Sequence, residues 1–203
     1  MLVKTLDESL IQEIGHAFGY YDYGTEKGLL SLYSSREAVS AYICGFVRGM
    51  LRGGFLYATG ERCEGFIAYK LPGQRIGLNT MGPILKGFFD SMTLKELFRF
   101  AKLMKNVGPA LRDRMDKKKQ PYIYVGMVCV REKYQGQGYM RKVMELAYAE
   151  GDRLGVPVVL DTDAQSKCDK YVHLGMELAG VRDLGEYGKF YDLIRYPNPI
   201  KRA

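Results

Sequence analysis

The sequence lacks long apolar runs and any cluster of cysteine or histidine residues. No segment approaches the roughly 18 consecutive apolar residues of a membrane-spanning helix. The first eight residues, 1–8, lack the apolar stretch of a signal peptide, so we expect a cytoplasmic protein with no membrane partner. The chain has two histidines and four cysteines, and the cysteines are far apart and form no C-x-x-C pair. A zinc site or a disulfide framework is therefore not expected, and no metal is predicted.

What is present is typical of one globular domain, which we expect to span residues 1–203. Apolar residues make up 47% and charged residues 26% of the chain, enough for one sizeable core. The net charge of +7 leaves two kinds of partner open, a nucleic acid or an anionic small ligand. The single basic run, 117–119, has no aromatic stacking motif beside it, and a ligand with several phosphates suits the charge equally well.

The first half of the chain carries signals for helices and one hairpin. Hydroxyl residues at Thr5, Ser34 and Thr93 each stand three positions before a glutamate, the capping-box spacing, and the last two precede amphipathic patterns. Runs at 55–59 and 65–70 predict an antiparallel hairpin. The segment 71–90 is rich in Gly and Pro and predicts a loop. We expect a helical insertion at about 82–120.

The second half predicts a parallel βαβ unit. The run 122–130 is almost entirely apolar, as in a central strand covered on both faces. A polar turn at 131–138 follows, then a helix that ends near Gly155 and a short buried strand at 156–160. A short helix at 167–174 and a hairpin of strands 177–183 and 190–196 close the chain. The predicted fold class is mixed α/β.

The turn between this strand and helix is suited to an anion. A helix start presents unpaired N–H groups and a positive dipole end, and Gly136 and Gly138 allow close approach of a ligand. Basic residues surround it: Arg131, Lys133, Arg141 and Lys142. Simple turn geometry explains the two glycines equally well. The spacing is neither that of a P-loop nor that of a dinucleotide-binding turn.

Two segments together resemble the GNAT superfamily of acetyl-CoA-dependent N-acetyltransferases. Residues 128–139, Val-Cys-Val-Arg-Glu-Lys-Tyr-Gln-Gly-Gln-Gly-Tyr, are similar to the family's apolar strand followed by [RQ]-x-x-G-x-[GA], with Gln135 and Gly138 at matching positions. Residues 171–176, Tyr-Val-His-Leu-Gly-Met, resemble its Y-x-x-x-G-F segment. The resemblance implies a central, largely antiparallel sheet with one parallel βαβ unit and helices on both faces, and a cofactor-binding core at about 120–175.

The resemblance also implies site residues and a reaction. Tyr171 is then the general acid that protonates the departing CoA thiolate; a tyrosine that packs on the sheet is the alternative. The acceptor is a primary amine of a small molecule or peptide, which attacks directly. The implied acetyl-CoA-binding residues are Val128, Val130, Gln135, Gly136, Gln137, Gly138, Tyr139 and Met140.

Other residues have a functional and a structural interpretation that the sequence leaves open. Glu64 is a candidate general base or a surface carboxylate, and His173 a proton carrier or an exposed helix residue. Tyr122 and Tyr124 line an acceptor cleft or pack on helices. The tyrosines of segment 20–23 cover a substrate or pack on the core.

Three functions remain open from the sequence. They are an N-acetyltransferase, a non-catalytic domain that senses acyl-CoA, and a basic nucleic-acid-binding domain. Only charge supports the last, and no nucleic acid is expected as a partner. The acceptor, the use of other acyl groups and the oligomeric state are not predicted.

Overall fold

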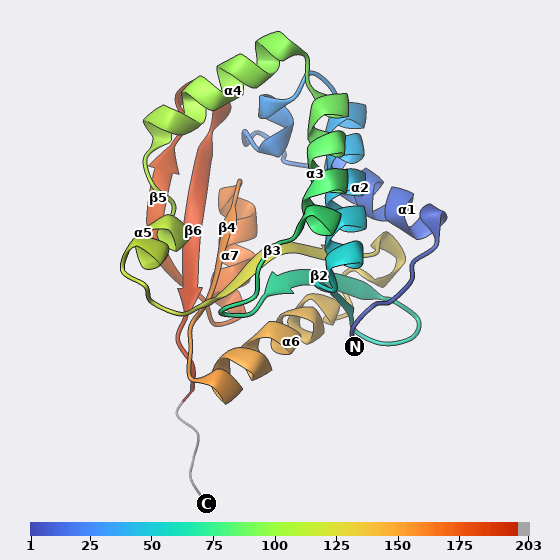
Figure 1. Ribbon diagram of the computed structural model, residues 1–203, viewed down its shortest axis with the longest axis vertical. Helices are drawn as coiled ribbons and strands as arrows, with labels where there is room; N and C mark the ends of the chain where they lie inside the picture. The colour runs from blue at the N-terminus through green and yellow to red at the C-terminus, as the bar shows by residue number, and fades with distance from the viewer. Residues whose placement is uncertain (199–203) are drawn as a thin grey trace, which may run out of the picture.

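The computed structural model describes residues 1–198, and these contain a six-stranded sheet in the order β1-β2-β3-β4-β6-β5 (Figure 1). The strands are β1 Leu56–Ala58, β2 Gly65–Lys70, β3 Ile123–Val130, β4 Val158–Thr162, β5 Glu177–Asp183 and β6 Lys189–Arg195. The helices are α1 Glu8–Gly19, α2 Arg36–Gly53, α3 Leu78–Ser91, α4 Leu94–Val107, α5 Leu111–Lys117, α6 Tyr139–Leu154 and α7 Gln165–His173. Three short 3-10 helices, η1 Leu29–Leu32, η2 Glu132–Tyr134 and η3 Gly185–Tyr187, complete the described chain.

The predicted fold class is confirmed. The β3–β4 pair is parallel and all the other strand pairs are antiparallel. Both predicted hairpins form, as β1–β2 and β5–β6, and the strand, helix and strand of the predicted βαβ unit are β3, α6 and β4. Among the described residues, no helix combines the length and the apolar character needed to cross a membrane.

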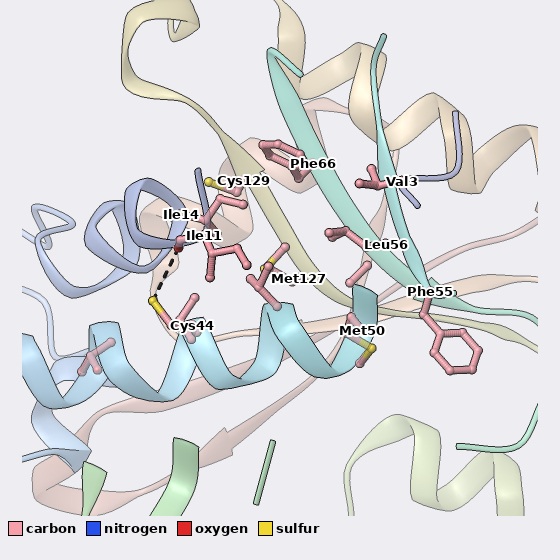
Figure 2. Close-up of a cluster of buried hydrophobic side chains, with 14 of the residues drawn as sticks. Val3, Ile11, Ile14, Cys44, Met50, Phe55, Leu56, Phe66, Met127 and Cys129 are labelled. Atoms are coloured by element: carbon pink, nitrogen blue, oxygen red, sulfur yellow. Dashed lines mark hydrogen bonds between the residues drawn. The ribbon is translucent and has the colours of Figure 1, made fainter. Parts of the chain in front are cut away.

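Two cores lie on opposite faces of the sheet. One face packs against α1 and α2, with Ile14, Phe66 and Met127 among its fully or almost fully buried residues (Figure 2). The other face packs against α6 and α7, through a separate cluster that includes Ile67 and Met144. Phe66 and Ile67 are neighbours on β2 and point to opposite faces, because successive side chains of a strand alternate.

A bulge in β3 reverses this alternation. Ala68 of β2 pairs with Met127 and the next residue, Tyr69, pairs with Val125, so Gly126 is the extra residue. Val125, before the bulge, and Val128, after it, both face the α6 side of the sheet, although they are three positions apart. The bulge lies next to the point where β3 and β4 separate, since these strands pair only at Ile123–Val158 and Tyr124–Val159. Beyond Tyr124, β3 therefore has no partner on its β4 side.

The capping predictions have mixed outcomes. Thr93 and Glu96 form the expected capping box at the start of α4. The other two are wrong by one or two positions: Ser35, not Ser34, caps α2 by accepting from the Ala38 N–H (3.1 Å), and Asp7, not Thr5, is the N-cap of α1. Several hydroxyl and acidic residues lie together at each helix start, and the backbone selects among them.

The loop predicted at 71–90 is also wrong, because most of it is α3. One of its glycines, Gly87, serves helix packing: a Cβ at Gly45 of α2 would lie 2.7 Å from the Gly87 Cα, so the two helices approach closely at this point. Pro83 is tolerated inside α3 and removes one intrahelical donor. The segment 82–120 thus contains the later part of α3 together with α4 and α5.

Candidate functional site

The predicted anion-binding turn has the conformation that its glycines allow. Gly136 and Gly138 have φ angles of +71° and +76°, in the left-handed region that favours glycine, and a Cβ at either would enter open space. The Gln135 side chain donates to the Val130 carbonyl (3.1 Å), and the Gln137 side chain donates to the Lys133 carbonyl (2.9 Å). These two glutamines hold the turn against the end of β3.

The start of α6 carries positive potential that no side chain of the described chain offsets. Gly138 is its N-cap and supplies no side-chain hydrogen bond, and the first turn contains no acidic residue. Instead, Arg141 and Lys142 lie in this turn, where the helix dipole disfavours a cation. An anion at this position would satisfy the free N–H groups and compensate both charges. The local chemistry therefore fits a phosphate-bearing ligand.

A cavity of about 1020 Å³ joins this turn to the interior of the molecule. That is at the upper end of the size range of small-molecule sites. Seven of the eight predicted cofactor-binding residues line it, namely Val128, Val130, Gln135, Gly136, Gly138, Tyr139 and Met140, and so does Tyr171. Gln137 does not, because its side chain turns back to Lys133. The fold thus brings the predicted binding residues and the predicted acid to one cavity.

Tyr171 lies on α7 and is half-buried at the cavity wall. Burial, together with the nearby Asp163 carboxylate, raises the pKa of its phenol above the ordinary value. A raised pKa keeps the hydroxyl protonated at neutral pH. Tyr171 can therefore donate a proton to a group in the cavity.

Asp163, which belongs to no motif of the sequence, organises the cavity wall beside Tyr171. Its carboxylate accepts from the Tyr23 hydroxyl (2.5 Å), the Leu29 N–H (2.6 Å) and the Lys167 ammonium (2.8 Å). The Lys167 ammonium also lies 4.3 Å from the centre of the Tyr21 ring. Two tyrosines of segment 20–23 therefore have different positions: Tyr21 lines the cavity, and Tyr23 hydrogen-bonds to Asp163 in the cavity wall.

Replacing Asp163 with asparagine should destabilise the protein in a pH-dependent way. Burial opposes the charged carboxylate, but Lys167 and the other donors outweigh burial and hold the pKa of Asp163 below its usual value. A lowered pKa stabilises the fold above the unfolded pKa of about 4, and this contribution is lost as the pH falls through the folded pKa. We expect D163N to lose about 2 kcal/mol of unfolding free energy at pH 7.

Urea unfolding at pH 7 and pH 3 checks this expectation, with D169N on the exposed face of α7 as the control. The difference between wild type and D163N should be constant from pH 8 to pH 5 and shrink below pH 4, whereas D169N should differ little at any pH. An equal loss for D163N at pH 3 and pH 7 would show that the carboxylate charge is not what stabilises the wall.

The start of α7 is capped from a distance. Its N-cap, Ala164, has no polar side chain. The Glu26 carboxylate, from the loop before η1, accepts from the N–H groups of Gln165 (2.6 Å) and Ser166 (3.1 Å) instead. The N–H groups at the start of α7 are therefore bound by the protein's own carboxylate, whereas those at the start of α6 have no side-chain cap.

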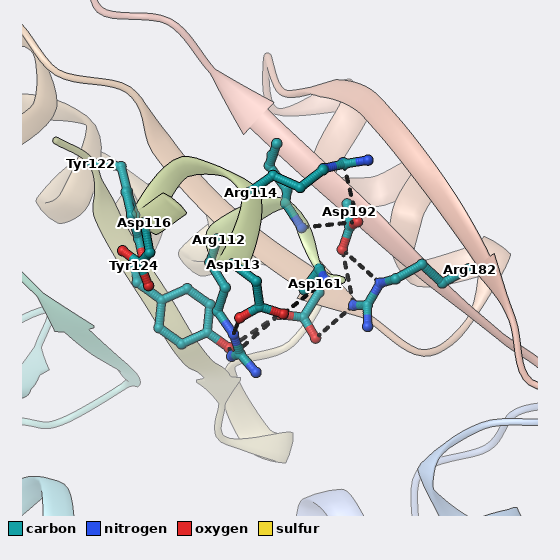
Figure 3. Close-up of polar contacts among 11 residues, drawn as sticks. Arg112, Asp113, Arg114, Asp116, Tyr122, Tyr124, Asp161, Arg182 and Asp192 are labelled. Atoms are coloured by element: carbon teal, nitrogen blue, oxygen red, sulfur yellow. Dashed lines mark hydrogen bonds and ion pairs between the residues drawn. The ribbon is translucent and has the colours of Figure 1, made fainter. Parts of the chain in front are cut away.

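A second polar cluster lies on the cavity wall beyond the separation of β3 and β4 (Figure 3). The Tyr124 hydroxyl donates to Asp161 Oδ1 (3.1 Å), and the Arg112 guanidinium stacks on the Tyr124 ring at 4.8 Å and donates to its hydroxyl. Arg182 binds Asp192, which is 1% exposed, through two hydrogen bonds of 2.9 and 3.1 Å. Burial, and then Asp161, raises the pKa of Tyr124, so its phenol stays a donor.

Tyr122 and Tyr124, for which the sequence left a cleft position and a packing position open, both line the cavity. Asp161 and Asp163 lacked a motif, but they follow the apolar core of β4 at its carboxyl end. Polar residues at this end of a parallel strand commonly form ligand sites, which is the one signal that would have found them.

Two other candidates lie elsewhere. Glu64 is held at the start of β2 by the Thr59 hydroxyl (2.9 Å) and Arg62 (3.1 Å) and does not line the cavity. His173 is exposed near the end of α7, as the structural interpretation of this residue expects. Neither is in a position to take a proton from a group in the cavity.

The cysteines and the acidic residues form no further site. All four thiols are unpaired; three are buried and Cys63 is half-buried. Within residues 1–198, no group of three His, Cys, Asp or Glu side chains is arranged to hold a metal ion.

Comparison with known proteins gives a family match and a shared fold. Residues 98–170 match the model of the Acetyltransferase (GNAT) family, from within α4 to the residue before Tyr171. No match was found among curated proteins. The resemblance to the GNAT superfamily is thereby confirmed for the segment that contains the predicted turn.

Two solved structures have similar folds over nearly the whole chain. One is the protein named histone acetyltransferase HPA2 and related acetyltransferase from Corynebacterium glutamicum, with 13% identity, a TM-score of 0.60 and coverage of 100% of this chain and 97% of that one. The other is an N-acetyltransferase from Staphylococcus aureus, with 15% identity, a TM-score of 0.55 and coverage of 96% and 99%. At these identities the likeness concerns the fold.

Proposed function

Because this chain carries a GNAT acetyltransferase segment on a GNAT fold, we propose that it is an N-acetyltransferase. It would transfer an acetyl group from acetyl-CoA to a primary amine of a small molecule or peptide. The observation that carries the proposal is the continuous cavity, which runs from the turn at α6 along the unpaired side of β3 to Tyr171.

The residues present fit acetyl-CoA. The pyrophosphate is assigned to the turn 135–140, where two left-handed glycines, free N–H groups and first-turn cations meet. The pantetheine arm is assigned to the backbone of Val128 and Val130, which β4 leaves unpaired. When bound, acetyl-CoA supplies a thioester carbonyl as the electrophile.

The protein residues mainly supply position and one proton. Holding the amine against the carbonyl makes the attack effectively unimolecular. The new C–N bond forms as the C–S bond breaks, and the amine nitrogen releases one proton to water. Tyr171 donates its phenolic proton to the departing thiolate and regains a proton from water. The Tyr171 phenol is protonated at neutral pH and has a proton to give, although burial raises its pKa and weakens it as an acid, so its position on the cavity wall carries the assignment.

A thermal-shift titration with acetyl-CoA, CoA and ATP tests the cofactor part of the proposal. Acetyl-CoA at 100 times its Kd should stabilise the fold by about 2.7 kcal/mol, a rise in Tm of roughly 5–10 °C for a chain of this size. CoA should act similarly and ATP should have little effect. No shift with acetyl-CoA at millimolar concentration would refute the proposed function.

A further inference from the structure

The part of the cavity beyond the polar cluster is lined by aromatic and thioether side chains. They come from three helices: Tyr42 and Phe46 of α2, Phe88 of α3, and Phe100 and Met104 of α4. The Phe88 ring stands edge-on to both Phe100 (centroids 5.6 Å apart) and Tyr42 (6.0 Å). These side chains offer ring faces and edges to the cavity and few polar groups.

Helix α4 covers this part of the cavity, which we call the aromatic chamber, and turns an apolar face towards it. In Figure 1, α4 crosses from α3 towards the β5–β6 edge of the sheet. None of its residues is buried, yet Leu97, Phe100, Leu103, Met104 and Val107 form an inward stripe. Phe100 and Met104 face the cavity. The stripe is already partly buried against the core on the α1–α2 face, and an apolar group in the cavity would bury Phe100 and Met104 further.

Asp161 lies on β4, between this chamber and the point where β3 and β4 separate, and its carboxylate can accept further hydrogen bonds. Three carboxylates line the cavity within the described chain. Asp163 already accepts three short hydrogen bonds, and Asp116 is exposed and accepts from Tyr122 (2.8 Å). Asp161 accepts one, from Tyr124, while Arg112 and Arg182 lie 3.7 and 3.5 Å from its oxygens, beyond good hydrogen-bond distance.

We propose, resting on the N-acetyltransferase function above, that the acceptor is a primary amine with an aromatic body. Its ring lies under α4 against Phe88 and Phe100, and its amino group hydrogen-bonds to Asp161. The Asp161 carboxylate by itself favours the ammonium form, and the two arginines at 3.7 and 3.5 Å from its oxygens weaken that preference, which eases loss of the proton. Only the neutral amine has the lone pair that attacks the thioester carbonyl.

Steady-state release of CoA by the full chain, with acetyl-CoA and 3-phenylpropylamine or propylamine, tests the body of the acceptor. The two amines have nearly the same basicity and differ by one ring. We expect kcat/KM to be at least about 30-fold higher for the phenyl compound. Equal values for the two amines, or faster acetylation of a hydrophilic tripeptide at its free N-terminus, would overturn the inference.

Two pairs of variants locate the interaction. F100S should cut the preference for the phenyl compound about tenfold, whereas F98S, on the same helix with a side chain 78% exposed, should leave it unchanged. D161N should raise KM for the amine about tenfold and leave KM for acetyl-CoA unaltered. The control variant D90N, on the surface of α3, should change neither KM. Equal effects of F100S and F98S, or no effect of D161N, would count against it.

The thermal shift with acetyl-CoA distinguishes failure of the proposed acceptor class from failure of the proposed acetyltransferase function. A normal shift together with equal rates for the two amines overturns the acceptor class alone. Absence of the shift overturns the acetyltransferase function, and the acceptor class with it.

Discussion

Replacing Tyr171 with phenylalanine is expected to lower kcat roughly 100-fold or more and to leave the affinity for acetyl-CoA unchanged. A positioned acid contributes about 10²–10⁴ to rate, and the phenyl ring retains the packing of α7 on the cavity wall. Single-turnover and steady-state measurements with 3-phenylpropylamine or any amine that the enzyme accepts give kcat, and the thermal shift with acetyl-CoA gives the affinity.

Tyr148 provides the matched control on α6. Its hydroxyl is buried and has no hydrogen-bond partner within the described residues, and it does not line the cavity. Y148F therefore removes the same atom from the same core without touching the site, and kcat should stay within about twofold of wild type. If Y171F kept the wild-type kcat, Tyr171 would not be the general acid. No turnover in wild type, despite a normal acetyl-CoA shift, would favour the acyl-CoA sensor instead.

The strand and turn that we propose bind the cofactor were predictable, because their signals are local in sequence. The apolar run, the two glycines and the helix that follows are contiguous in sequence, and Tyr171 lies only one short strand further on. Each element reports its own structure through periodicity or turn chemistry. The bulge at Gly126 and the adjacent separation of β3 from β4 were not predictable, because a strand pattern alone reveals neither.

The polar cluster that we propose faces the acceptor was missed, because its residues come from segments far apart in sequence. Arg112, Tyr124, Asp161 and Arg182 belong to α5, β3, β4 and β5 and meet only in the folded sheet. The error at α3 has a related cause. Glycine normally signals a loop, but Gly87 is used for close contact with Gly45 of α2, a tertiary need that outweighs helix propensity.

Placing a side chain at Gly138 should remove much of the affinity for acetyl-CoA. Asparagine tolerates the left-handed conformation better than other residues, so G138N adds a side chain at a modest backbone cost. The side chain enters open space at the start of α6, where the pyrophosphate is assigned. Losing one or two charge-assisted hydrogen bonds should weaken binding about 10- to 100-fold, measured by calorimetric titration of acetyl-CoA.

Gly155 separates this effect from backbone strain. It caps the other end of α6 with a φ of +65°, close to the +76° of Gly138, and its Cβ position is also open. G155N therefore carries a similar strain at a site remote from the cavity and should lower Tm by a similar amount while acetyl-CoA binds normally. If G138N and G155N weaken binding equally, the loss arises from the stability of α6. If only G138N weakens it, the glycine is there for close approach of the ligand, and the turn is the phosphate site.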